Sequence, residues 1–331
     1  MLGKKLQSLS GLIKVLIISH DNPDPDSIAS SWGLAHLLKK EFGIKSTIAY
    51  GGLLGRAENR AMVSVLKIPL VQFSPLILKN SEAILMVDCQ PYTGNSTLPE
   101  EIIPDVVIDH HPFRETTKYK QWAYFDDKIG ATSTIIVSVI RERNFSIPKR
   151  LATALFHAIR SETKDLGWEG TRQDYKNYLF LLPKVDFKAL YHISYPPLSS
   201  AYYRSVKEAL DRSMIYKFVI TCPLGNVPYP ELPAEIANFL IFKENIDFSL
   251  VIGYYEGDLF ISIRSLRRDV NSAGLMQSIL KGYGRGGGHE TMAGGKISNV
   301  PFYKLKEIEK IVIKRFLKAF SLSHLKGEKL V

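Results

Sequence analysis

The chain is organised around the segment Ser19-His20-Asp21-Asn22-Pro23-Asp24-Pro25-Asp26-Ser27. An apolar run over residues 14–19 leads into it and predicts a buried strand. Apolar residues at spacings of three and four follow it and predict a helix over residues 27–42. The loop between them gathers one imidazole and three carboxylates, and its two prolines restrict the backbone. Like charges at close range repel unless a cation or a proton neutralises them, so the sequence predicts a metal site here.

The composition is that of a globular protein with two domains. The chain has 331 residues, of which 45% are apolar and 23% are charged. No apolar run approaches the roughly 20 residues that cross a bilayer, and the N-terminus lacks the apolar segment of a signal peptide. The two cysteines, Cys89 and Cys222, form neither a C-x-x-C pair nor a zinc pattern. These features favour a cytoplasmic protein without membrane contact.

The formal charge of +10 is consistent with a phosphate-rich partner. Many cytoplasmic proteins are basic without such a partner, so charge alone leaves both interpretations open.

Residues 14–125 alternate short apolar runs with helical patterns. The predicted strands are residues 14–19, 46–50, 83–88 and 105–109, and the predicted helices are residues 27–42 and 57–66. This alternation predicts an α/β fold, with an N-terminal parallel sheet covered by helices on both faces. In such sheets the functional groups lie just beyond the carboxyl ends of the strands.

Three of these predicted strands end in residues that can bind metals. The first ends in His20, the third in Asp88, and the fourth in Asp109-His110-His111. A single acidic residue after a strand is usually a helix cap or a turn residue. Three strands that end this way at one edge of a sheet indicate a shared site.

The next segments could complete that site. Residues 130–134 predict a loop entering a helix, in which the small hydroxyl residues could cap the helix or approach a ligand; we expect them to cap it. A second apolar helix, residues 151–159, runs into a polar segment with carboxylates at Glu162 and Asp165. One of these carboxylates could be a further ligand.

A second domain follows a proline-interrupted linker. We predict a catalytic domain over residues 1–182, a linker with one or two helices over residues 183–215, and a smaller α/β domain over residues 216–325. The smaller domain is expected to contain a hairpin that turns at residues 256–258, and helices at residues 233–243, 272–282 and 301–320. A glycine-dense loop, residues 282–295, lies between the last two helices.

Aspartate and histidine ligands without thiolates suit manganese or magnesium before zinc. His20, Asp24 and Asp26 lie too close together in sequence to share one ion comfortably, so two ions with a bridging carboxylate are expected. Two-metal sites clamp the attacking and leaving oxygens of a phosphoryl displacement and activate a water molecule. The sequence therefore predicts a phosphoryl-transfer centre.

The smaller domain offers groups that suit a phosphate. Glycine-rich backbone can present N–H groups without obstruction by side chains, and an arginine adds a fork of donors. The candidate substrate-binding residues are Arg264, Ser265, Gly286, Gly287, Gly288 and His289. A flexible turn without a ligand is the alternative for the glycine stretch.

Taken together, these motifs resemble the DHH phosphoesterase family with its type 1 DHH-associated domain. The resemblance rests on the residue 20–26 loop, Asp88, the Asp109-His110-His111 triplet and the Gly286–His289 stretch, in the family's order. The most similar branch contains the nanoRNases and pAp phosphatases, together with stand-alone cyclic-dinucleotide phosphodiesterases.

The resemblance implies a role for each position. His20 and Asp24 would hold one manganese ion, Asp26 and His110 would hold the other, and Asp88 would bridge them. The family usually carries an Asp-Thr pair as its fourth motif, whereas this chain has Glu162-Thr163. That change could reposition the second metal or leave Asp165 to replace it.

His111 would contact the scissile phosphate, and Asp109 would orient the histidine pair. The substrate-binding residues named above would grip a terminal nucleotide or phosphate.

The leading hypothesis is a manganese-dependent phosphoesterase, with magnesium as the other candidate ion, acting on short oligonucleotides (nanoRNA), on pAp, or on both. A cyclic-dinucleotide phosphodiesterase is the first alternative. A RecJ-type single-strand exonuclease and a non-catalytic nucleotide-binding scaffold are less favoured. The sequence leaves open the exact substrate, homodimerisation and the binding of longer nucleic acid.

Overall fold

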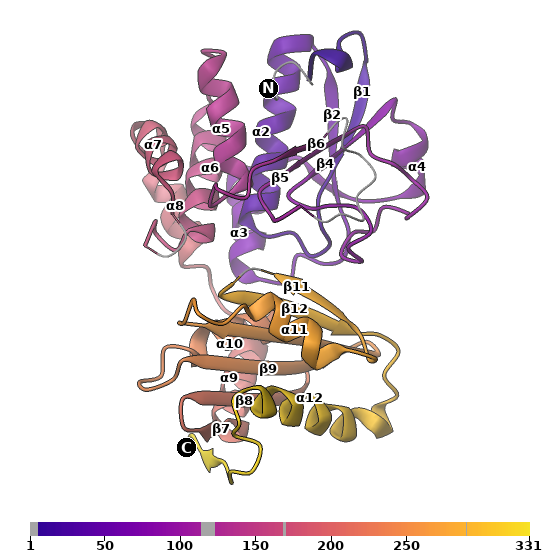
Figure 1. Cartoon of the computed structure of the whole chain (residues 1–331). Coiled ribbons are helices and arrows are strands. Elements are labelled where there is room, and N and C mark those ends of the chain that lie inside the picture. The colour runs from indigo at the N-terminus through magenta and orange to yellow at the C-terminus, as the bar shows by residue number, and fades with distance from the viewer. Residues whose placement is uncertain (1–5, 114–122, 168–169, 289) are drawn as a thin grey trace. The chain divides into compact units, whose positions relative to one another are not determined.

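The chain folds into two compact units, Met1–Pro196 and Pro197–Val331. The computed structural model, drawn in Figure 1, describes residues 6–113, 123–167, 170–288 and 290–331. The boundary falls inside the predicted linker, residues 183–215. Helix α8 (Phe187–Ser194) from this segment belongs to the first unit, and helix α9 (Ser200–Arg212) belongs to the second.

The first unit is built on a six-stranded parallel sheet. Its strands are β1 (Lys14–Ile18), β2 (Lys45–Tyr50), β3 (Leu70–Gln72), β4 (Ala83–Val87), β5 (Val106–Asp109) and β6 (Ala123–Phe125). Their order is β3-β2-β1-β4-β5-β6, so the chain moves outward from β1 to β3 and then returns to place β4 beside β1. The reversal puts a topological switch point between β1 and β4, where open α/β sheets bind their ligands. The predicted parallel sheet is confirmed.

Helices cover both faces of this sheet. They are η1 (Gln7–Leu9), α2 (Pro25–Phe42), α3 (Ala57–Leu66), α4 (Pro75–Lys79), α5 (Thr132–Glu142), α6 (Lys149–Glu162), α7 (Arg172–Leu181), η2 (Leu182–Lys184) and α8. On one face, Val15 and Ile17 of β1 share a core with α2, α5 and α6, which lie side by side in Figure 1. On the other face, Leu16 and Ile18 pack toward α4.

The opening stretch starts helix α2 in a defined way. Asp24 is the N-cap, and its Oδ1 accepts a hydrogen bond of 2.9 Å from the backbone N–H of Ser27. Pro25 occupies the first helical position, where its missing N–H costs no hydrogen bond. Gly43, with φ of 72°, ends the helix in the left-handed conformation that glycine tolerates. The loop that carries the candidate ligands is therefore fixed by the helix that follows it.

The second unit has a seven-stranded mixed sheet in the order β11-β12-β10-β9-β8-β7-β13. Its strands are β7 (Met214–Tyr216), β8 (Val219–Asn226), β9 (Phe248–Tyr255), β10 (Asp258–Ser265), β11 (Arg285–Gly288), β12 (Met292–Ile297) and β13 (Glu328–Lys329). All neighbouring pairs are antiparallel except β8 and β9. The predicted hairpin is confirmed by β9 and β10, whose turn contains Glu256 and Gly257 at positive φ.

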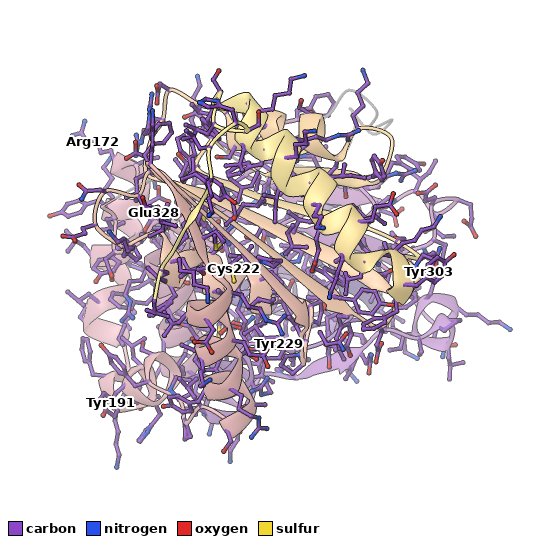
Figure 2. All side chains as sticks on the ribbon, turned by 90° about the horizontal axis from the view of Figure 1, so that it is seen from below. Arg172, Tyr191, Cys222, Tyr229, Tyr303 and Glu328 are labelled. Carbon is purple, nitrogen blue, oxygen red and sulfur yellow. The ribbon has the colours of Figure 1, made fainter. Side chains whose placement is uncertain are left out.

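Helices pack on both faces of the second sheet. They are α9, α10 (Leu232–Leu240), α11 (Ser272–Leu280), η3 (Phe302–Lys304) and α12 (Leu305–Ala319). Leu250 and Ile252 of β9 face the core shared with α11 and α12, whereas Val251 faces the core shared with α10. Cys222 is fully buried in this second core, while Tyr303 lies on the surface (Figure 2). No helix among the described residues has the length and apolarity that a membrane span requires.

The glycine-dense segment differs from the predicted loop, because most of it forms the β11–β12 hairpin. The hairpin needs glycine so that α11 can lie directly against it. A Cβ atom on Gly286 would stand 2.5 Å from Met276 Cγ, and one on Gly295 would stand 2.3 Å from Leu280 Cδ1. Close helix packing therefore accounts for part of the glycine content.

Candidate metal centre

Three neighbouring strands deliver metal-binding side chains to one edge of the first sheet. His20 follows β1, Asp88 follows β4, and Asp109, His110 and His111 lie at the end of β5. Because β4 lies between β1 and β5, Asp88 comes between the two groups of histidines. The structure therefore brings together residues from all three predicted strand ends.

Asp88 is the centre of this cluster. Its Oδ2 lies 3.7 Å from His20 Nε2, and its Oδ1 lies 3.7 Å from His110 Nε2. The same His20 nitrogen is 3.7 Å from Asp24 Oδ1. Among the residues that the structure describes, ligand atoms within 4.8 Å of one another occur in two groups. One contains His20, Asp24 and Asp88, and the other contains Asp88, His110 and His111. Asp88 belongs to both groups, as a bridging carboxylate would.

Backbone carbonyls fix the orientation of two imidazoles. His20 Nδ1 lies 2.9 Å from the carbonyl oxygen of Asp21, and His110 Nδ1 lies 3.1 Å from that of Ile129. A carbonyl can only accept, so each Nδ1 donates, which leaves Nε2 as the nitrogen through which each ring can bind a metal. Both Nε2 atoms lie near Asp88. This is the arrangement in which histidine binds metals.

The cluster concentrates negative charge in a buried place. Asp88 is 2% exposed, and its pKa lies well above the usual range because it is buried and because the carboxylates of Asp26 and Asp24 are near. Burial lowers the pKa of His20, but the carboxylate of Asp24 outweighs this effect and raises the pKa to about 9. A divalent cation would relieve the same repulsion without protonation.

The donor set also fits hard divalent cations. Cys89 is next to Asp88 in sequence, but burial first and then nearby carboxylates raise its pKa well above the usual range. The thiol therefore stays protonated, and the site offers carboxylate oxygens and imidazole nitrogens. This combination suits manganese or magnesium.

The Asp88 backbone has a strained conformation. Its φ of 59° lies in the left-handed region, and its N–H donates to the carbonyl oxygen of Ile108 at 2.8 Å. Such strain in a non-glycine residue often marks functional sites.

Asp26 contacts the start of helix α5. Its two carboxylate oxygens accept hydrogen bonds of 2.7 Å from the N–H of Thr132 and 2.8 Å from that of Ser133. Asp26 belongs to neither of the two ligand groups among the described residues. Each carboxylate oxygen has a second lone pair, so a metal-ligand role remains a prediction.

The expectation that hydroxyl groups cap α5 is wrong. The N-cap is Ala131, which has no side chain for this purpose. Thr132 Oγ1 instead donates to Asp88 Oδ1 at 2.7 Å. The hydroxyl therefore orients the central carboxylate, a role that the sequence pattern did not reveal.

A buried carboxylate on α7 holds the segment that begins α5. Asp174 is fully buried and accepts a hydrogen bond of 2.9 Å from the N–H of Gly130. It also accepts from the hydroxyls of Thr134 and Thr171. Sequence reasoning missed this residue, although the T-x-x-D spacing of Thr171 and Asp174 is a helix-capping signal.

Asp109 orients His111. It is fully buried, and its Oδ1 lies 2.7 Å from His111 Nδ1 while its Oδ2 accepts from Gln90 at 2.8 Å. Burial raises the pKa of Asp109, but the neighbouring His111 outweighs burial and holds it below the usual range. Because Nδ1 of His111 contacts this carboxylate, we assign that nitrogen to Asp109 rather than to a metal. His111 Nε2 is then the atom directed to other partners.

The two candidate carboxylates of the fourth motif lie in different environments. Glu162 ends α6, and its charge is among those that add to the effect of burial in raising the pKa of Asp88. The side chain of Asp165 is 77% exposed, and its Oδ1 lies 3.2 Å from Arg160 Nε. Of the two carboxylates, Glu162 is thus the one whose charge acts on Asp88.

Arg264 and Ser265 are held by contacts inside the second unit. Arg264 is 8% exposed and donates from Nε to Asn238 Oδ1 at 2.6 Å and from Nη1 to Ser262 Oγ at 2.8 Å. The Ser265 hydroxyl bonds the N–H and the carbonyl oxygen of Arg267. Their predicted substrate contacts remain predictions.

The glycines of β11 form part of one sheet face. Gly287 pairs with Gly294, which pairs with Ser262 of β10, so these residues face the same side as Arg264. A Cβ atom on Gly294 would meet no atom within 4 Å, so this part of the face is open. Gly286 faces Met276 of α11. His289 lies outside the described residues.

Family models match both units. The model of the DHH family, N-terminal domain, matches residues 14–159, and the DHHA1 domain model matches residues 219–321. An uncharacterized protein of Methanocaldococcus jannaschii is 31% identical over 287 residues, 86% of this chain and 58% of that protein. A probable manganese-dependent inorganic pyrophosphatase of Enterococcus faecalis is 27% identical over 45% of this chain and 48% of its own length. The chain thus spans less than two thirds of either relative.

Two solved structures share the fold. An exopolyphosphatase-related protein from Bacteroides fragilis superposes with a TM-score of 0.76 at 19% identity, covering 98% of this chain and 97% of its own. RecJ from Thermus thermophilus, solved in complex with Mn²⁺, superposes with a TM-score of 0.53 at 12% identity, covering 98% of this chain and 59% of its own. At these identities the similarity concerns the fold alone.

Proposed function

The chain belongs to the DHH family and carries a DHHA1 domain, and on this basis we propose that it is a metal-dependent phosphoesterase acting on short oligonucleotides, on pAp, or on both. The observation that carries the proposal is the environment of Asp88. A 2% exposed carboxylate with one histidine Nε2 at 3.7 Å from each of its oxygens suits a bridging ligand of two cations.

The proposed metal ligands divide into two sets. His20, Asp24 and Asp88 would hold one ion, and Asp88, His110, Asp26 and Glu162 would hold the other. When bound, the two ions would polarise the phosphoryl oxygens and supply an activated water molecule. Manganese is the proposed ion because these ligands are oxygens and imidazole nitrogens without a thiolate.

The remaining residues of the centre would orient other side chains and bind the scissile phosphate. Asp109 keeps the imidazole of His111 in one orientation, so that Nε2 can contact an oxygen of the scissile phosphate. Thr132 would hold Asp88 in its bridging position through the 2.7 Å hydrogen bond. Neither role requires these residues to bind a metal.

The second unit would bind the end of the substrate. The sheet face that is open at Gly294 also carries Gly287 and, on β10, the 8% exposed Arg264. Glycine backbone allows a phosphate or a nucleotide base to approach closely, and arginine supplies charge-assisted donors. We propose that this face, together with Ser265 and His289, selects short substrates.

The test is hydrolysis by the purified full chain with Mn²⁺, measured on a 5′-phosphorylated dinucleotide, pAp and a cyclic dinucleotide. The expected result is activity on the dinucleotide or pAp and a loss on the order of 10³-fold in Asp88→Ala, the scale for groups that act in the transition state. Asp211→Ala, which removes an exposed carboxylate on α9, is the control and should retain activity. Absence of hydrolysis of all three substrates would refute the catalytic proposal. Activity on the cyclic dinucleotide alone would instead identify a cyclic-dinucleotide phosphodiesterase.

A further inference from the structure

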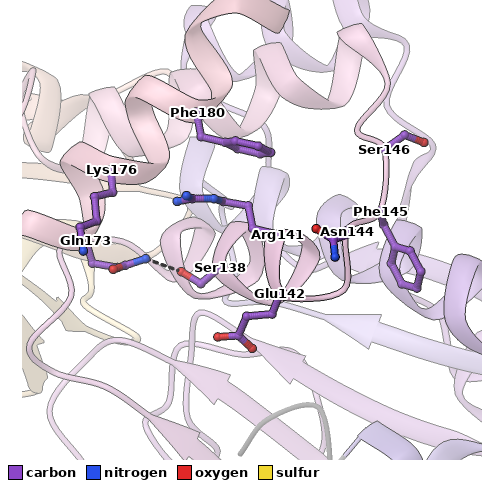
Figure 3. Close-up of a pocket in the computed structure, with 9 residues that line it drawn as sticks. All are labelled: Ser138, Arg141, Glu142, Asn144, Phe145, Ser146, Gln173, Lys176 and Phe180. Atoms are coloured by element: carbon purple, nitrogen blue, oxygen red, sulfur yellow. Dashed lines mark hydrogen bonds between the residues drawn. The ribbon is translucent and has the colours of Figure 1, made fainter.

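A cavity of about 690 Å³ lies at the surface of the first unit, between α5, α7 and the loop after α5 (Figure 3). Its volume falls within the range of roughly 300–1,000 Å³ for small-molecule sites. Its lining residues are Ser138, Arg141, Glu142, Asn144, Phe145, Ser146, Gln173, Lys176 and Phe180. All belong to the first unit.

The cavity contains a preorganised arginine. The Cζ atom of Arg141 lies 4.7 Å from the centroid of the Phe180 ring, and its Nη1 donates to Asn177 Oδ1 at 2.6 Å. Asn177 is fully buried, and its own amide donates to the carbonyl oxygen of Thr134 at 2.9 Å and to Ser138 Oγ at 2.8 Å. The guanidinium is therefore held in place, so little side-chain freedom is lost when it binds a ligand.

The charge of the lining favours an anion. Arg141 and Lys176 supply two positive charges against the single carboxylate of Glu142. In Figure 3 the Arg141 guanidinium extends toward α7, whereas the Glu142 carboxylate points away from it. Gln173 comes from α7 and donates to Ser138 Oγ at 3.0 Å, so amide and hydroxyl groups lie beside the two cations.

The cavity is separate from the candidate metal centre. Helix α5 reaches from one site to the other, and its first residue, Thr132, contacts Asp88. Arg141 lies near the other end of that helix, at about 14 Å along its axis for a rise of roughly 1.5 Å per residue. A ligand on Arg141 therefore does not occupy the metal site.

We propose that this cavity is a second binding site, which takes a small phosphate-bearing anion of the size of a nucleoside diphosphate. The planar fork of Arg141 matches two phosphate oxygens, and Lys176 adds a second charge that a chain of phosphates can reach. The proposal does not depend on the catalytic proposal, since none of the lining residues belongs to the metal centre.

The experiment is calorimetric titration of ADP into the full chain after treatment with a chelator. Without metal ions, the phosphates of ADP cannot bind by metal coordination, and binding reports on other sites. The expected result is one ADP per chain, with at least about tenfold weaker binding in Arg141→Gln, because hydrogen bonds to charged groups are involved. Lys176→Gln should weaken binding by about three- to tenfold. Because Lys176 is exposed, a loss of binding in this variant would not result from misfolding.

Arg172→Gln is the matched control. Arg172 lies on the same helix as Lys176, is exposed (Figure 2), and does not line the cavity, so the variant removes the same charge from outside the site. It should keep the wild-type affinity within about twofold. The proposal is overturned if ADP does not bind at millimolar concentration, if all three variants bind equally well, or if Arg264→Gln abolishes binding while Arg141→Gln does not.

Discussion

At the level of single residues, Glu162 and Asp165 are the two candidates for the fourth predicted ligand position. Glu162 adds to the negative charge around Asp88, whereas Asp165 is turned to solvent beside Arg160. Glu162, and not Asp165, is therefore kept as the proposed ligand at this position.

We predict that Glu162→Ala lowers the rate of hydrolysis by about tenfold or more, the scale for residues that support a metal site. Glu162→Asp keeps a carboxylate and should recover part of the loss, while Asp165→Ala should stay within about twofold of wild type. Rates at increasing Mn²⁺ concentration measure these effects. A larger loss in Asp165→Ala than in Glu162→Ala would reverse the assignment.

Individual contacts at the centre were only partly predictable. His20, Asp88 and His110 could be identified because each follows an apolar strand, and parallel strands place their carboxyl ends together. The contacts of Asp26 with the backbone of α5 could not be predicted, because Thr132 and Ser133 lie 106 and 107 positions after Asp26 in the sequence. Local patterns carry no information on such pairs.

At the element scale, the glycines of the β11–β12 hairpin serve two different purposes. Gly286 leaves room for Met276 of α11, whereas Gly294 leaves the opposite face of the sheet open. Substitutions at these positions separate packing from binding.

We predict that Gly286→Ala destabilises the second unit by about 1–3 kcal/mol, because its Cβ would overlap Met276. Gly294→Ala should leave the thermal unfolding temperature unchanged and raise KM for the substrate, because its Cβ projects into open space on the proposed binding face. An unchanged KM in the folded Gly294→Ala variant would remove this face from the proposal.

Helix α12 carries a buried carboxylate with a measurable effect on stability. Glu309 is 9% exposed, and burial raises its pKa to about 6 although Arg212 and Lys306 act in the opposite direction. The folded state then holds a proton that the unfolded state has already lost, so stability falls as pH rises from about 4.5 through 6.

The amide of the Glu309→Gln variant does not titrate, so this variant should not share the loss of stability with rising pH. We expect the unfolding free energy of the variant, relative to wild type, to rise by about 1 kcal/mol between pH 4.5 and pH 8. Glu307→Gln, at an exposed position of the same helix, is the control. A relative stability of Glu309→Gln that does not depend on pH would contradict the assignment.

The elements themselves were predicted best where they are long and buried. Strands β1, β4 and β5 and helices α2 and α3 follow their apolar patterns closely. Strands β3 and β6 were missed because each has three residues, none of them buried. The β11–β12 hairpin was missed because glycine has low strand propensity, and pairing with β10 overrides that preference.

At the scale of the whole molecule, the net charge of +10 contrasts with the acidic metal centre. A substrate of two or three nucleotides contacts few basic residues, so binding should depend weakly on salt. We predict that the affinity for a dinucleotide falls by less than about tenfold between 50 and 200 mM salt. A fall of about 10³-fold would instead indicate a path for longer nucleic acid.

The number of Mn²⁺ ions that the full chain binds tests the bridging role of Asp88 directly. It can be followed by electron paramagnetic resonance during a titration. Because Asp88 belongs to both ligand groups, wild type should bind two ions per chain, and Asp88→Ala should lose tight binding of both. Wild-type protein that binds no Mn²⁺, or an Asp88→Ala variant that still binds two ions tightly, would contradict a two-metal centre bridged by Asp88.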